Sequence, residues 1–86
     1  MPRVSEFFGV VIDMYYNDHN PPHFHAEYGG DEASFSIDTL ELCEGELPRR
    51  ARALVVEWAS LHRRELLANW ERARQELPLQ PIEPLD

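Results

Sequence analysis

Hydrophobic and polar residues alternate with a period of two along the first half of the chain, a pattern typical of β-strands that pack one face on a core. A first strand is predicted from Phe7 to Tyr16, a second from His23 to Tyr28 and a third from Ala33 to Asp38. Gly29-Gly30-Asp31 separates the second from the third and predicts a tight hairpin. Residues 39–44 are predicted to form a turn and a short fourth strand. The pattern therefore predicts an antiparallel meander of three or four strands.

The second half of the chain has the composition and spacing of α-helices. Pro48 suits the first turn of a helix, and neither glycine nor proline occurs from there to Glu76. The hydrophobic residues recur at helical spacing, but their stripe rotates by about a quarter turn beyond Leu61. One straight helix of this span would be roughly 43 Å long, too long for so small a domain. We therefore predict two helices, or one sharply kinked helix, with the break between Leu61 and Arg64.

Together these elements predict an α+β fold in which the C-terminal helices pack on one face of the sheet. Residues 1–86 are expected to form a single domain. Residues 77–86 carry a proline at every third position, which predicts an extended, polyproline-like tail. Three placements of this tail stay open: along an apolar groove, on its own domain, or frayed. The expected core consists of Phe8, Val10, Ile12, Phe24, Ala26, Phe35, Ile37, Leu54, Val55, Trp58, Leu66 and Trp70.

Composition and charge narrow the class of protein. A chain of 86 residues buries only a marginal core, so a protein partner or a homo-oligomer is expected. The formal net charge of −8 repels a phosphate backbone, which argues against non-specific nucleic-acid binding. Cys43 is the only cysteine, so an intramolecular disulfide and a multi-cysteine zinc site are excluded. The sequence shows no membrane span and no long apolar N-terminal stretch, so we expect a cytoplasmic protein.

The segment from Asn17 to His25 gathers three of the four histidines around a Pro-Pro corner. His23 and His25 are two residues apart on a predicted strand, so their imidazoles project from one face. Such a pair offers two nitrogen ligands to a divalent transition metal such as zinc. The side chains within reach as a third ligand are His19, Asp18, Glu27 and Asp13. The predicted ligand set is His19, His23 and His25.

Two other roles for these histidines stay open. Histidine titrates near neutral pH, so the cluster could perform acid–base chemistry with Asp13 or Asp18 orienting a ring. The rings could also be purely structural, capping exposed carbonyl groups or stacking on neighbouring tyrosines.

Arg49, Arg50 and Arg52 lie at the start of the first predicted helix, where positive charges oppose the helix dipole. Free backbone N–H groups at this end already favour negative charge, so the three arginines are a candidate anion site. The alternative is that acidic side chains neutralise them in ordinary surface pairs. The candidates for such pairing are Glu44, Glu46 and Glu57. If the arginines lie near the histidines, the two groups together would indicate a phosphate-containing ligand.

Three motifs occur in order along the chain: FFGVVIDMYYNDHNPPHFHAEY, EGELPRRA and EWASLHRRELLANW. Through them the chain resembles, from about Pro2 to Pro84, a small bacterial family described only as domain-of-unknown-function family 4160. The residues that match the family pattern are His19, Pro21, Pro22, His23, His25, Pro48, Arg49, Arg50, Trp58, His62 and Trp70. The resemblance implies a small cytoplasmic prokaryotic protein. Genes of this family commonly neighbour those of another short family with DNA-binding-like members, which implies a toxin–antitoxin-like role, and no catalytic residues carry over.

The leading functional hypothesis is a non-enzymatic, partner-binding component of a two-gene, toxin–antitoxin-like module. Small size, acidic charge, the lack of a recognised catalytic motif and the resemblance support it. The alternative is a metal-dependent hydrolase or nuclease, in which the three histidines hold the metal and Arg49 and Arg50 hold phosphate. Direct, specific DNA binding is disfavoured by the charge. Whether the protein is an enzyme stays open at this point.

Overall fold

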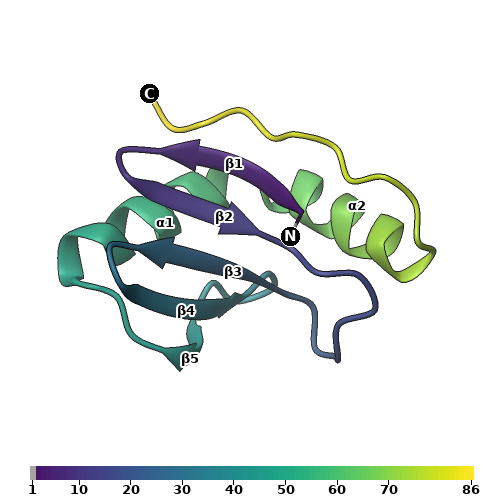
Figure 1. Ribbon diagram of the computed structural model, residues 1–86, viewed down its shortest axis with the longest axis horizontal. Coiled ribbons are helices and arrows are strands. Elements are labelled where there is room, and N and C mark those ends of the chain that lie inside the picture. The colour runs from purple at the N-terminus through teal and green to yellow at the C-terminus, as the bar shows by residue number, and fades with distance from the viewer. Residues whose placement is uncertain (1) are drawn as a thin grey trace.

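The computed structural model describes residues 2–86 and consists of an antiparallel sheet followed by two helices (Figure 1). The strands are β1 (Arg3–Phe7), β2 (Val10–Asp13), β3 (His23–Tyr28), β4 (Asp31–Ser36) and β5 (Leu42–Gly45), and the helices are α1 (Arg49–Leu61) and α2 (Arg63–Arg74). Each strand pairs with the next along the chain, giving the order β1-β2-β3-β4-β5. The predicted α+β class is confirmed, and the sheet has five strands rather than three or four.

The fifth strand is β1, which precedes the predicted first strand and overlaps it only at Phe7. β1 ends at Phe7 and β2 begins at Val10, and the two residues between them reverse the chain. Phe8 and Gly9 both have positive φ, 49° and 83°, the sign combination of a type I′ hairpin turn. The side chain of Phe8 therefore projects from the turn and is 59% exposed, so its predicted place in the core is wrong. The rest of the predicted core is confirmed, with Leu54 only partly buried.

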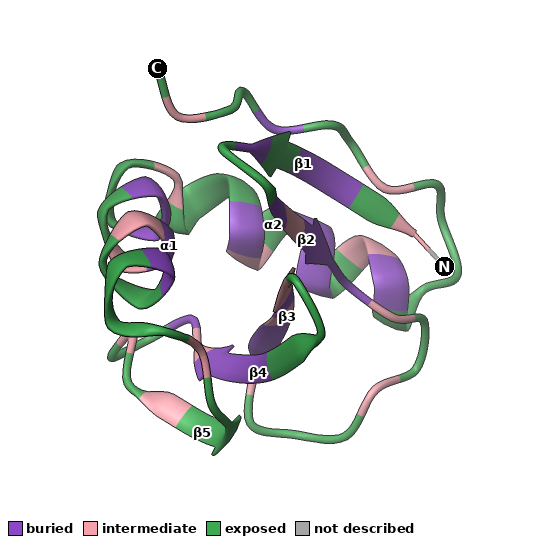
Figure 2. Ribbon diagram, turned by 60° about the vertical axis from the view of Figure 1, so that its left-hand side comes forward, coloured by how far each residue is buried: buried purple, intermediate pink, exposed green. Residues whose placement is uncertain are grey.

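The core lies between one face of the sheet and the two helices, whose buried residues face inward (Figure 2). Trp58 of α1 occupies its centre, with its ring centroid 5.4 Å from that of Phe7 and 6.0 Å from that of Phe24. The predicted break in the helical segment is confirmed at His62, where φ is −127°. α2 then adds Leu66 and Trp70 to the same core.

The C-terminal residues 77–86 run extended beside β1, on the edge away from β2 (Figure 1). The N–H of Ile82 donates to the carbonyl oxygen of Val4 at 2.8 Å, and the Ile82 side chain is buried. Asn69 of α2 exchanges two hydrogen bonds with the backbone of Gln80, at 2.9 and 2.8 Å. The tail therefore packs on its own domain and covers one edge of the sheet. Within residues 2–86, no helix is long and apolar enough to cross a membrane.

Candidate metal centre

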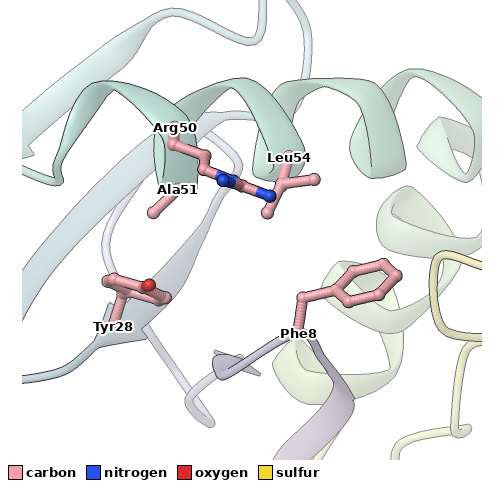
Figure 3. Close-up of a pocket in the computed structure, with 5 residues that line it drawn as sticks. All are labelled: Phe8, Tyr28, Arg50, Ala51 and Leu54. Carbon is pink, nitrogen blue, oxygen red and sulfur yellow. The ribbon is translucent and has the colours of Figure 1, made fainter.

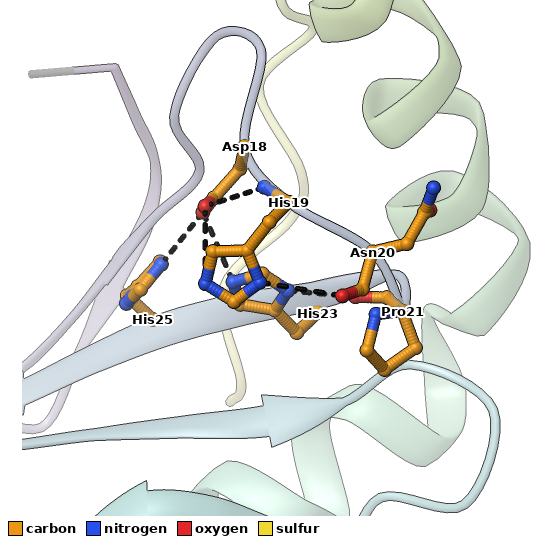
Figure 4. Close-up of polar contacts among 6 residues, drawn as sticks. All are labelled: Asp18, His19, Asn20, Pro21, His23 and His25. Carbon is orange, nitrogen blue, oxygen red and sulfur yellow. Dashed lines mark hydrogen bonds and ion pairs between the residues drawn. The ribbon is translucent and has the colours of Figure 1, made fainter.

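His23 and His25 project from the same face of β3, and Asp18 reaches them from the loop between β2 and β3 (Figure 4). The Oδ2 atom of Asp18 lies 3.0 Å from Nε2 of His23 and 3.0 Å from Nε2 of His25. Among residues 2–86, these three side chains form the group whose ligand atoms all lie within 4.8 Å of one another. One carboxylate oxygen thus sits between two imidazole nitrogens.

One local and one long-range hydrogen bond hold the loop between β2 and β3 in place. The backbone N–H of His19 donates to Oδ1 of Asp18 at 2.9 Å, which fixes the carboxylate. The Asn20–Pro21 peptide bond is cis, and the Asn17 side chain donates to Glu76 beyond the end of α2 at 3.4 Å. The carboxylate is therefore positioned by the backbone beside it and is not a freely rotating surface group.

The hydrogen bonds of His23 define which of its nitrogens carries a proton. Nδ1 lies 2.8 Å from the carbonyl oxygen of Pro21, and because a carbonyl only accepts, Nδ1 must be protonated. In the neutral ring, Nε2 then directs a lone pair at Asp18 Oδ2, which is also an acceptor. Two acceptors 3.0 Å apart repel, so the contact requires either a second proton on His23 or a metal ion between the two atoms. A histidine that binds a metal commonly makes such a bond to a backbone carbonyl with its other nitrogen.

Electrostatics keep the Asp18 carboxylate ionised. Burial by itself raises the pKa of Asp18, but the hydrogen bond from His25, the backbone N–H of His19 and the charges of His23 and His25 together bring the pKa below its usual value. His23 is buried, whereas His25 keeps 20% of its side chain exposed. The ionised carboxylate of Asp18 is therefore available to a cation, and the exposed part of His25 leaves one side of the group open to solvent.

Asp13 lies next to this group without joining it. It pairs with His25 across β2 and β3, and the residue is only 2% exposed. Burial raises the pKa of Asp13, and a hydrogen bond with Glu27 and repulsion from the same carboxylate raise it further. The raised pKa means that Asp13 loses its proton less readily than Asp18, which makes it a poorer metal ligand.

The predicted ligand His19 lies at the mouth of the group. Its side chain is 76% exposed, and its Nε2 is 3.8 Å from Oδ1 of Asp18. Its ring centroid is 5.0 Å from that of His23. The third side chain of the converging group is thus Asp18, one of the alternatives from the sequence, and the predicted role of His19 as a ligand stays a prediction. The spacing of the residues could not separate the two, because both lie in the same loop.

Of the three arginines at the start of α1, Arg50 lies on the opposite face of the sheet from the histidines. Tyr28 points to the opposite face of β3 from His23 and His25, and Arg50 lines a pocket together with Tyr28 and Phe8 (Figure 3). Arg49, Arg50 and Arg52 are exposed and form no ion pair within residues 2–86. Their role as an anion site stays a prediction, and the placement does not support a single phosphate site shared with the histidines.

Two hollows adjoin the histidines on the polar face of the sheet. The larger is lined by His25, Glu32, Ala33, Ser34, Glu44 and Gly45. The smaller is lined by His19, Pro21, His23, Ser34, Cys43 and Glu44. Ser34 and Glu44 belong to both, and sequence reasoning missed their place here. Only the register of β4 against β3 and β5 brings them beside the histidines.

A family model described as a domain of unknown function (DUF4160) matches residues 9–71. The chain belongs to this family. The resemblance found in the sequence is thereby confirmed. Asp18, His23, His25 and the arginines of α1 all fall within the family region, whereas β1 and the C-terminal tail lie outside it. Neither the comparison with curated proteins nor that with solved structures gave a match.

Proposed function

We propose that this protein is a metal-dependent hydrolase whose centre consists of Asp18, His23 and His25. The observation that carries the proposal is the convergence of two imidazole Nε2 atoms, each 3.0 Å from the same carboxylate oxygen. Ligand atoms around a tetrahedral zinc ion are about 3.3 Å apart. The three ligand atoms of this group all lie within 4.8 Å of one another, so small shifts of the side chains accommodate the ion. Two histidines and one carboxylate leave a coordination position open, as in catalytic rather than structural zinc sites.

Different residues would hold the metal ion, orient its ligands and transfer protons. A metal ion bound in an open site lowers the pKa of a coordinated water and so supplies a nucleophile near neutral pH. The Pro21 carbonyl orients His23, and the backbone N–H of His19 orients Asp18. The exposed imidazole of His19 lies at the mouth of the centre, where it can hold or release a proton.

The test is the stoichiometry of metal binding. Protein freed of metal by a chelator is expected to bind one Zn²⁺ per chain in a calorimetric titration and to release protons as it does so. The competing explanation is a purely structural cluster, in which a second proton on His23 satisfies Asp18. That explanation predicts no stoichiometric binding, so a value well below one ion per chain would contradict the proposal.

We propose, as a second function compatible with the first, that the protein is the cytoplasmic, partner-binding component of a bacterial two-gene, toxin–antitoxin-like module. The observation that favours it is a cavity of about 290 Å³ lined by Phe8, Tyr28, Arg50, Ala51 and Leu54 (Figure 3). An exposed phenylalanine beside an arginine has the composition of a protein-binding hot spot. The cavity lies on the face of the sheet opposite the metal centre, so both functions can coexist.

Affinity purification from the native bacterial host tests this second function. The wild-type protein is expected to recover one specific partner, and Phe8→Ser is expected to reduce the recovery about tenfold or more, because a hot-spot residue contributes 2 kcal/mol or more. Leu61→Ser is the matched control, since Leu61 is 67% exposed at the end of α1 and does not line this cavity. Equal recovery by the wild type and Phe8→Ser, or no specific partner at all, counts against the proposal.

A further inference from the structure

The strand register places one row of side chains across the polar face of the sheet. His25 on β3 pairs with Ser34 on β4, and Ser34 pairs with Glu44 on β5. Residues paired across antiparallel strands project from the same face, so Glu44 faces His25 across the short side chain of Ser34. The two hollows beside the row, of about 320 and 130 Å³, contain His25 and His23 respectively. A ligand that enters this groove therefore reaches the open side of the metal centre.

Apart from the histidines, the charged side chains that line the groove are acidic. The chain has neither lysine nor arginine between Arg3 and Arg49, so the charged side chains of β2 to β5 are acidic apart from His23 and His25. Arg3 on β1 extends the row, because it pairs with Asp13 and Asp13 pairs with His25, but it lines neither hollow. Glu44 lines both hollows and Glu32 lines the larger. The closest arginines in sequence, at the start of α1, include Arg50 on the opposite face. Among residues 2–86, no lysine or arginine lines either hollow to neutralise a phosphate group.

We infer that the groove selects the ligand of the metal centre by charge, and that Glu44 and Glu32 are the specificity-determining residues. The preferred ligand is an amide or peptide with a positively charged group, and phosphate esters are disfavoured. Asp18, His23 and His25 would hold the metal ion, to which the polar oxygen of such a ligand would donate a lone pair, while Glu44 attracts its cationic end. This inference rests on the proposed hydrolase function and names its substrate class.

Three hydroxamates of equal chain length test the inference, because they differ only in the charge of the tail. They are 6-aminohexanehydroxamate with a positive tail, hexanehydroxamate with a neutral tail and adipic monohydroxamate with a negative tail. Binding to the Co²⁺-loaded protein is followed by its visible absorption spectrum. The positive probe is expected to bind roughly fivefold more tightly than the neutral one, and the negative probe roughly fivefold more weakly.

Glu44→Gln is expected to reduce the differences in affinity between the charged probes and the neutral probe to about twofold or less, because it removes the charge of the side chain and keeps its shape. Glu57→Gln is the matched control, since Glu57 is an exposed carboxylate of α1 that lines neither hollow. Equal affinity for the three probes, ratios unchanged in Glu44→Gln, or tighter binding of inorganic phosphate than of the positive probe would overturn the inference. Failure of Co²⁺ to bind at one ion per chain would overturn the proposed function itself.

Discussion

Replacing His25 by alanine is expected to weaken Zn²⁺ binding by more than about 100-fold, because loss of an outer contact of a metal ligand already costs 10- to 100-fold. The change removes one of the two nitrogens that lie 3.0 Å from Asp18 Oδ2. His25 is partly exposed, so alanine leaves no closed cavity in the core. Calorimetric titration measures the affinity directly.

Two further histidines give matched controls for this variant. His62→Ala is expected to leave the affinity unchanged, because His62 pairs with Glu65 at 2.6 Å and lies outside the converging group. His19→Ala is expected to weaken binding less than about tenfold, since its loss removes no converging ligand. A larger loss for His19→Ala than for His25→Ala would return His19 to the ligand set predicted from the sequence.

Thermal unfolding gives an independent measurement of the loss of Zn²⁺ binding in His25→Ala. Zn²⁺ at 100 times its dissociation constant adds about 2.7 kcal/mol to the free energy of unfolding when only the folded chain binds it. The wild type should therefore melt at a higher temperature with Zn²⁺, and His25→Ala should not. An equal effect of Zn²⁺ on the two proteins would show that the ion binds elsewhere.

Replacing Trp58 by alanine is expected to cost about 3–5 kcal/mol in the free energy of unfolding. The Trp58 side chain is fully buried against Phe7 and Phe24, so alanine leaves a large cavity at the centre of the core. Domains are typically stable by only about 5–15 kcal/mol, so this single change removes a large share of the total. Urea denaturation, followed by circular dichroism, measures the difference in the free energy of unfolding between the wild type and Trp58→Ala.

The hydrogen bond of Trp58 to the tail can be measured separately with phenylalanine. Trp58→Phe keeps much of the packing but loses the bond from Nε1 to the carbonyl oxygen of Glu83, which is 2.8 Å long. Trp70→Phe is the matched control, because the buried Nε1 of Trp70 has no hydrogen-bond partner among residues 2–86. We expect Trp58→Phe to cost roughly 1 kcal/mol more than Trp70→Phe. Equal costs would show that the bond to the tail contributes nothing to stability.

The sequence predicted the elements whose local pattern is unambiguous. Period-two alternation identified β3 and β4 with the correct faces, because a strand must turn its apolar side to the core. The rotation of the apolar stripe located the break at His62, because a straight helix cannot keep two rotated stripes on one core. The turn at Phe8 was missed, since an aromatic residue with positive φ is not a recognised turn signal.

In the candidate centre too, the local sequence pattern determined some of the geometry and the tertiary structure determined the rest. The sequence by itself determined that His23 and His25 share one face of a strand, because that follows from the period of two alone. Only the tertiary structure decided that Asp18 completes the group, because the path of the loop carries its carboxylate back to both rings. Tertiary structure likewise decided that Glu44 faces the centre through the pairing of strands, and that Arg50 lies on the other face of the sheet. Such contacts depend on register and chain path, which no local pattern of residues specifies.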